Sequence, residues 1–255
     1  MSLRIAIAGK GGTGKSTFSA IMCRSLLNNN IRPLLAVDAD PNSCLPEKLG
    51  IAVEQTIGDL REELRRDPDR KPAGIPKGEW MESMIERAVI ESTGIDMLVM
   101  GRQEGPDCYC YINNLLRQCM DRIGKNYQGV VIDNEAGLEH LSRRTNGTME
   151  VLLVIAHPTI AGAKTAMRIM ELVRSLKLDV GCCYLVLNQL DAEVDPGLKT
   201  EFDRTGIEII GTVPTDPLIR DFELKAVSLM TLPAESKAVI AVETILQKIL
   251  ERRKV

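Results

Sequence analysis

A glycine-rich segment near the start of the chain combines lysine and hydroxyl side chains at spacings that suit a triphosphate. It reads Gly-Lys-Gly-Gly-Thr-Gly-Lys-Ser-Thr over residues 9–17, after an apolar run and before a helix-like stretch. Glycines let backbone N–H groups converge on a phosphate, and the following helix adds the positive end of its dipole. Lys15 offers a charge to the β- and γ-phosphates, and the Ser16 hydroxyl can bind Mg²⁺. The predicted nucleoside triphosphate site comprises Gly9, Lys10, Gly11, Gly12, Thr13, Gly14, Lys15, Ser16 and Thr17.

Apolar runs further along the chain end in aspartate at two places. Asp38 and Asp40 follow one run, and Asp133 ends another. Carboxylates at the carboxyl ends of parallel strands face the ligand crevice. Asp133 is therefore placed to hold Mg²⁺ through a water molecule, as such an aspartate does in phosphate-loop NTPases. Asp38 and Asp40 either share this chemistry or cap the helix that follows them.

Two cysteines separated by one residue offer a different chemistry. In an extended segment, Cys108 and Cys110 would point to the same side and could face one metal ion. Two thiolates fall short of the four-coordinate shell that soft metals prefer, whereas two copies of the chain would supply four. The pattern predicts a metal site on the two-fold axis of a dimer, the alternative being two incidental reduced loop cysteines.

The elements that must position these groups follow a strand–helix rhythm. Continuous rather than alternating apolar runs are typical of strands that are buried on both faces of a parallel sheet. We predict an α/β fold, with a mostly parallel central sheet of about seven strands, helices on both faces and a single domain over residues 1–255. The predicted strands are Leu3–Ala8, Pro33–Asp38, Ile95–Met100, Gly129–Asp133, Val151–Ala156, Gly181–Asn188 and Ile207–Val213.

Composition argues against two classes of partner. The net charge of −3 provides no electrostatic footprint for nucleic acid. No apolar run approaches the ~20 residues that cross a bilayer, and the N-terminus does not read as a signal peptide. The amphipathic tail, residues 238–255, is expected to dock on its own sheet rather than on lipid. We therefore expect a cytoplasmic protein that binds neither nucleic acid nor membrane.

The glycine-rich segment contains a second lysine, Lys10, which is typical of one family of ATPases. With it, the segment resembles the deviant phosphate loop of a dimeric ATPase family that includes nitrogenase iron protein, division-site and chromosome-partition ATPases and metal-cluster assembly ATPases. In that family the extra lysine reaches across the dimer interface to the partner's nucleotide, so the resemblance implies a homodimer. It also implies that Asp40 positions the attacking water with support from Asp38. The catalytic residues would then be Lys10, Lys15, Asp38 and Asp40.

The choice of base is open in the sequence. Asn188-Gln-Leu-Asp191 is close to the guanine-reading pattern of GTPases. In the resembled ATPases, an asparagine at the position of Asn188 reads adenine, and the loop that contains Pro214 and Asp216 packs against the base. We favour ATP because Lys10 and the two aspartates of the 38–40 segment belong to the ATPase pattern.

The segment after Asp133 sharpens the resemblance. It reads Glu-Ala-Gly-Leu-Glu-His-Leu-Ser-Arg-Arg-Thr over residues 135–145 and is placed to sense the γ-phosphate; the alternative for Glu139 and Arg143 is an i,i+4 pair on a helix surface. Together with Cys-Tyr-Cys, it resembles the CooC/AcsF family of nickel-insertion ATPases, which mature carbon monoxide dehydrogenase or acetyl-CoA synthase.

This resemblance implies a homodimer that uses ATP and Mg²⁺, binds one Ni²⁺ or Zn²⁺ through Cys108 and Cys110 of both chains, and delivers the metal to one of these client enzymes. Three alternatives stay open: an iron–sulfur reductase or assembly ATPase, a nickel-insertion GTPase, and a spatial regulator on membrane or DNA.

Overall fold

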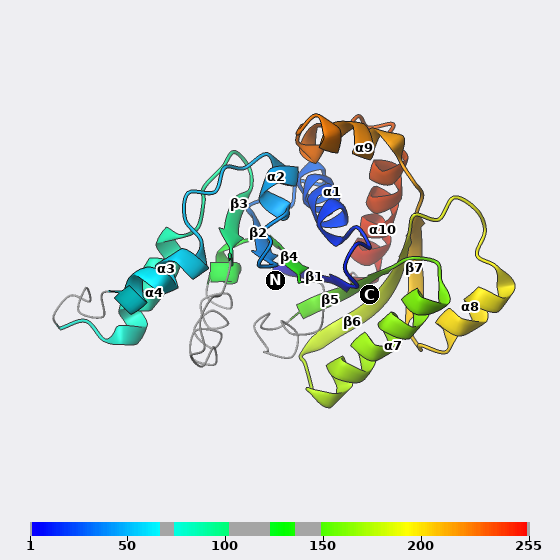
Figure 1. Cartoon of the computed structure of the whole chain (residues 1–255), viewed down its shortest axis with the longest axis horizontal. Helices are drawn as coiled ribbons and strands as arrows, with labels where there is room; N and C mark the ends of the chain where they lie inside the picture. The colour runs from blue at the N-terminus through cyan, green and yellow to red at the C-terminus, as the bar shows by residue number, and fades with distance from the viewer. Residues whose placement is uncertain (1, 67–73, 102–122, 136–148, 254–255) are drawn as a thin grey trace.

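The computed structural model describes residues 2–66, 74–101, 123–135 and 149–253. A seven-stranded sheet forms its centre (Figure 1), and every neighbouring pair of strands is parallel. The strand order is β3-β2-β4-β1-β5-β6-β7, which confirms the predicted fold class. The strands are β1 (Leu3–Gly9), β2 (Leu34–Ala39), β3 (Asp96–Val99), β4 (Gly129–Asn134), β5 (Met149–Ala156), β6 (Val180–Asn188) and β7 (Glu208–Val213).

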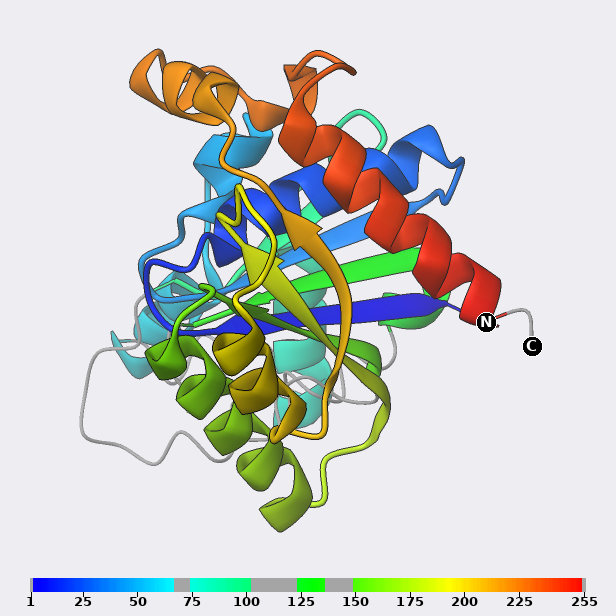
Figure 2. The same cartoon turned by 90° about the vertical axis from the view of Figure 1, so that its right-hand side faces the viewer.

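Helices cover both faces of the sheet, as Figure 2 shows. Helices α1 (Lys15–Asn28) and α10 (Lys237–Arg253) lie on one face, and α7 (Ile160–Ser175) and α8 (Pro196–Asp203) lie on the other. At the β3 edge are α3 (Ile57–Arg66) and α4 (Lys77–Arg87). The short elements are α2 (Leu45–Leu49), η2 (Gly124–Asn126), α9 (Pro217–Leu224) and η3 (Leu229–Thr231).

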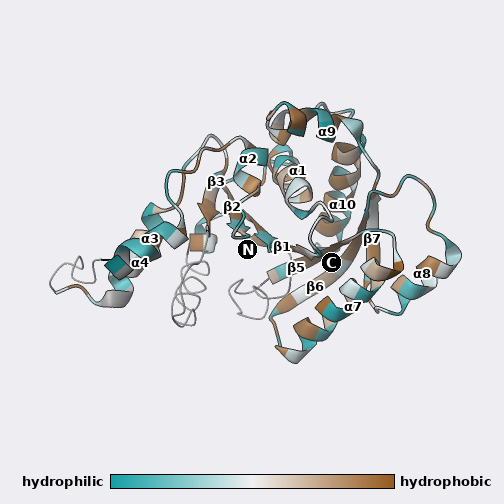
Figure 3. Cartoon of the chain, viewed as in Figure 1, coloured by the Kyte–Doolittle hydropathy of each residue, from teal (hydrophilic) through white to brown (hydrophobic). Residues whose placement is uncertain are grey.

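Each face of the sheet has its own hydrophobic core. In β1, Leu3, Ile5 and Ile7 belong to the core beneath α1 and α10, while Ala6 and Ala8 belong to the opposite core. This alternation follows from the period of two in a strand. Both sets are apolar because both faces are covered, and Figure 3 shows the hydrophobic colour concentrated in the strands.

The amphipathic tail forms α10 and docks on the sheet. Val242, Ile245 and Leu246 are buried in one core with Ile210 and Val213 of β7. The predicted docking of this helix on its own sheet is therefore confirmed. None of the helices in the described ranges is both long and apolar enough to cross a bilayer.

Candidate nucleotide site

The phosphate loop runs from β1 directly into α1. Gly14 has a left-handed backbone (φ 84°), and a Cβ at this position would lie 2.5 Å from Asn188 Nδ2, so only glycine fits. The loop is closed by Thr13 Oγ1, which donates to the Lys10 carbonyl at 2.8 Å. Lys15 Nζ donates to the same carbonyl at 3.4 Å. The predicted strand–loop–helix context of the phosphate motif is therefore present.

A cavity of about 580 Å³ extends from the phosphate loop to the carboxyl ends of β6 and β7, a volume in the range of small-molecule sites. Ten of the predicted site residues line it: Gly11, Gly12, Gly14, Lys15, Ser16, Thr17, Asp40, Asn188, Pro214 and Asp216. Five do not, namely Gly9, Lys10, Thr13, Asp38 and Asp133. The cavity thus brings together the predicted phosphate and base ends.

Lys15 lines this cavity, whereas Asp133 does not, and the charges of these two buried residues interact. Burial lowers the pKa of Lys15, and the charges of Asp133 and Asp40 counteract this effect. Burial likewise raises the pKa of Asp133 to about 6, although the Ser16 hydroxyl and the Lys15 ammonium favour its ionised form. The ionised lysine therefore depends on nearby carboxylates in the nucleotide-free chain.

The donor set suits a magnesium ion. Asp133 Oδ1 accepts a hydrogen bond from Ser19 Oγ at 3.1 Å, whereas the buried Oδ2 accepts none from the described residues. An unpartnered buried carboxylate oxygen is costly, and a hard cation or its water would satisfy it. Ser16 and, through water, Asp133 would hold the ion, which would supply positive charge next to the phosphates.

Asp38 and Asp40 differ in what they contact. Asp38 is fully buried beside Asp133 of the neighbouring strand, and it accepts hydrogen bonds from the backbone N–H groups of Asp40 (3.0 Å) and Leu45 (2.9 Å). Asp38 thus anchors the start of α2, which was the alternative reading of this residue. Asp40 lines the cavity and accepts from the Asn42 N–H and Nδ2 at 2.9 Å, both through Oδ1. Its Oδ2 has no donor among the described residues, so it is available to a water molecule.

The base end is held together by polar contacts within the protein. Asn188 Nδ2 donates to the Thr13 carbonyl at 2.7 Å. Asp216 caps α9 through Leu218 N (3.0 Å) and contacts the start of α10 through Ala238 N (3.1 Å). Burial favours the neutral form of Asp216, but these bonds and one from Ser236 outweigh it and lower the pKa. The carboxylate of Asp216 is thus used to position the loop that lines the base end.

The model of the CobQ/CobB/MinD/ParA nucleotide-binding domain matches residues 5–229. The chain belongs to this family. Among its relatives, an uncharacterized ATP-binding protein of Methanocaldococcus jannaschii is 41% identical over 251 residues, which cover 98% of this chain and 99% of that protein. The carbon monoxide dehydrogenase accessory protein CooC of Rhodospirillum rubrum is 29% identical over 230 residues, 86% of each chain.

Solved structures show the same CobQ/CobB/MinD/ParA fold. The cell division ATPase MinD of Pyrococcus furiosus superposes with a TM-score of 0.72 at 22% identity, over 99% of this chain and 100% of that one. MinD of Pyrococcus horikoshii, solved with Mg-ADP, superposes with a TM-score of 0.71 at 23% identity, over 100% of this chain and 99% of that one. The chain is thus a nucleotide-binding ATPase of the MinD/ParA/CooC type, which confirms the first resemblance at the level of this family.

Three residues that contact the phosphate loop or line the cavity had not been predicted from the sequence. His157 follows β5, and its Nε2 lies 3.2 Å from the Gly12 carbonyl of the phosphate loop. Lys48 and Glu223 line the nucleotide cavity and pair with each other. The position of His157 just beyond a strand that ends at this edge was a usable signal, whereas nothing local marks a pair 175 residues apart.

Several predicted residues lie outside the described ranges. They are the metal candidates Cys108 and Cys110, together with residues 136–145 of the predicted γ-phosphate sensor. The role of each of these residues stays a prediction.

Stability should depend on pH through Asp38. Burial raises the pKa of this carboxyl to about 7, although hydrogen bonds from Leu45 and Asp40 oppose the change. The folded chain therefore binds a proton more tightly than the unfolded chain, so the free energy of unfolding should fall as pH rises from about 4 to 7. This group contributes at most about 4 kcal/mol to the fall. Urea unfolding at several pH values with a metal chelator measures it, and Asp38→Asn should flatten the profile. An unchanged slope in that variant would contradict the assignment.

Proposed function

We propose that the chain is an ATP-hydrolysing maturation factor that binds nickel and inserts it into the metal cluster of carbon monoxide dehydrogenase or acetyl-CoA synthase. Nickel is the cargo, and a nucleotide-gated homodimer would carry it. The observation that favours this function is a backbone link between the nucleotide site and the segment that contains Cys108 and Cys110. Each part of the proposal rests on different contacts.

ATP with Mg²⁺ is the nucleotide that the site supports best. The orphan carboxylate oxygen of Asp133 suits the ion, and a relative 41% identical is named as an ATP-binding protein. A guanine-reading role for Asp191 is disfavoured because this residue does not line the cavity. Instead its Oδ1 accepts from Thr215 N at 2.8 Å and so ties two loops together.

A homodimer agrees with the position of Lys10. This side chain is exposed and does not line the cavity of its own chain. Lysine is a strong point charge for phosphate, yet in its own chain Lys10 lines a small cavity beside His157 rather than the nucleotide cavity. The side chain is therefore available to a nucleotide bound by a second copy, as the family resemblance implies.

The stem of the cysteine segment is attached to the nucleotide site. Residue 102 follows Gly101 and Met100, which come directly after β3. Met100 N donates to the Asp38 carbonyl at 2.9 Å, and the Met100 carbonyl accepts from Gly58 N at 2.9 Å at the start of α3. A shift of Asp38 on nucleotide binding would therefore pull on this stem. This is a physical path by which ATP could change the metal site, and metal binding must then change ATP affinity by the same factor.

Cys108 and Cys110 would supply the thiolates for Ni²⁺, with Zn²⁺ as a substitute, and two chains would complete four ligands. The CooC relative is named as an accessory protein of carbon monoxide dehydrogenase, which is one of the two proposed clients.

Nickel stoichiometry tests the proposal directly. Anaerobic, reduced protein should bind about one Ni²⁺ per two chains in equilibrium dialysis, and Cys108→Ser plus Cys110→Ser should abolish both this binding and metal-dependent dimerisation. Cys182→Ser plus Cys183→Ser is the matched control, because these neighbouring thiols lie on β6 outside the nucleotide cavity.

Nickel that is absent, or that the Cys108/Cys110 variant binds as well as the wild type, would overturn the nickel-insertion proposal. A bound iron–sulfur cluster, visible in the absorption spectrum, would instead favour the reductase or assembly alternative.

A further inference from the structure

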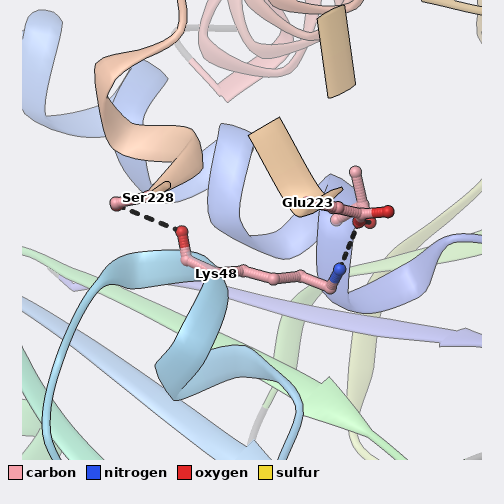
Figure 4. A network of polar contacts seen from close by, with 4 residues as sticks. Lys48, Glu223 and Ser228 are labelled. Atoms are coloured by element: carbon pink, nitrogen blue, oxygen red, sulfur yellow. Dashed lines mark hydrogen bonds and ion pairs between the residues drawn. The ribbon is translucent and has the colours of Figure 1, made fainter. Parts of the chain in front are cut away.

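An ion pair crosses the nucleotide cavity between two helices that are far apart in the sequence. Lys48 Nζ of α2 pairs with Glu223 Oε1 of α9 (Figure 4). The same carboxylate oxygen accepts a hydrogen bond from Thr17 Oγ1 of α1 at 3.2 Å. All three residues line the cavity. The Glu223 carboxylate therefore binds both a hydroxyl group of the phosphate motif and a nearby ammonium group.

The backbone beneath Lys48 is held in place separately from its side chain. The Lys48 carbonyl accepts a hydrogen bond from Ser228 Oγ at 3.2 Å (Figure 4). Gly50 ends α2 with φ 73°, and a Cβ there would lie 2.9 Å from Ser228 Cβ, so the two segments approach closely. The other end of α2 is bonded to Asp38 through Leu45 N. Lys48 can thus change its partner by rotating its side chain while α2 stays docked.

The position of Glu223 should affect nucleotide binding. Thr17 belongs to the first turn of α1, where backbone N–H groups and the helix dipole attract phosphate. A carboxylate bonded to this turn would lie near the phosphates and repel them, because both groups are anionic. Lys48, freed from Glu223, would instead attract them, because its ammonium group is a point charge that suits phosphate.

We propose that Lys48 is a further nucleotide-binding residue, and that Glu223 competes with the nucleotide phosphates for Lys48 and Thr17. In the nucleotide-free chain Glu223 holds both donors. When a nucleotide enters, its phosphates take them over and Glu223 turns away. This inference rests on the nucleotide-binding part of the proposed function and is independent of nickel.

Calorimetric titration of ADP into three full-length variants tests the inference. Glu223→Gln should tighten binding about 3- to 10-fold because the competing charge is removed, and Lys48→Met should weaken it by a similar factor. Both differences should shrink in about 0.5 M salt. Glu208→Gln is the matched control: it removes an ion pair with Arg252 (2.6 Å) that does not line the cavity, and it should leave the dissociation constant unchanged.

The direction in which Glu223→Gln changes ADP affinity distinguishes competition with the nucleotide from a purely structural ion pair. If Glu223→Gln weakens ADP binding as Lys48→Met does, the pair only holds α2 against α9 and the inference is wrong. It is also wrong if both variants bind like the wild type. Absence of ADP binding by the wild-type chain would contradict the nucleotide part of the proposed function instead. Thermal unfolding of each variant checks that the fold is retained.

Discussion

Replacement of Lys10 by alanine should lower ATP hydrolysis per chain about 100- to 10,000-fold and leave ATP binding by a single chain within a few-fold of the wild type. A cation supplied across an interface to the transferred phosphoryl group contributes on the order of 10³ to 10⁵ in the arginine-finger enzymes, and a lysine on a flexible stem should contribute somewhat less. Single-chain binding should persist because Lys10 does not line its own cavity.

The dependence of phosphate release on protein concentration measures this effect. Wild-type activity per chain should rise with concentration and then level off as dimers form, while Lys10→Ala should stay low throughout. Lys199→Ala replaces another exposed lysine, on α8, and serves as the control. A Lys10→Ala variant that hydrolyses ATP at the wild-type rate would exclude a role for this lysine in a partner's site, and with it the nucleotide-gated dimer.

Replacement of Asp40 by asparagine should lower the rate of the chemical step about 100- to 1,000-fold while ATP affinity changes little. A positioned general base contributes roughly 10² to 10⁴ to a rate. Asparagine keeps an oxygen for the hydrogen bonds from Asn42, so the local backbone should be preserved and only the charge that attracts the water's proton is lost.

A rapid-quench single-turnover measurement separates the chemical step from product release. Asp195→Asn is a suitable control, because this aspartate caps α8 through Gly197 N (2.9 Å) and Leu198 N (3.1 Å) and does not line the cavity. Equal loss of ATP affinity and of rate in Asp40→Asn would assign Asp40 to binding rather than to water positioning.

The fold and the phosphate end of the site could be predicted because their signals are local. Each strand is a short apolar run that follows from burial on both faces. All seven predicted strands are present, and their ends differ from the prediction by at most one residue, except that β5 begins two residues earlier. The phosphate loop depends on glycine conformations within a few residues, as at Gly14. Asp38 and Asp133 meet because strands of one parallel sheet end at one edge.

The remaining parts of the site depend on contacts that no local pattern encodes. The loop that contains Pro214 and Asp216 was predicted to pack against the base, but the hydrogen bonds from the Asp216 carboxylate to the starts of two helices were not predicted. Asp216 is followed by a proline, which is typical of a helix start, so its capping of α9 could have been predicted, whereas its contact with α10 could not. The partner of Lys48 could not be predicted, because it depends on how α9, which follows β7, lies relative to α2.

The nucleotide cavity is built from segments spread over most of the chain, which affects when it can form during synthesis on the ribosome. Thr17 lies 206 residues before Glu223, and Ala238 and Val242 of α10 also line the cavity. At ordinary translation rates, about 10 to 40 s separate the appearance of Thr17 from that of Glu223. A nascent phosphate loop therefore has no completed cavity wall to bind against. Nucleotide capture should therefore be a late event that reports a nearly finished chain.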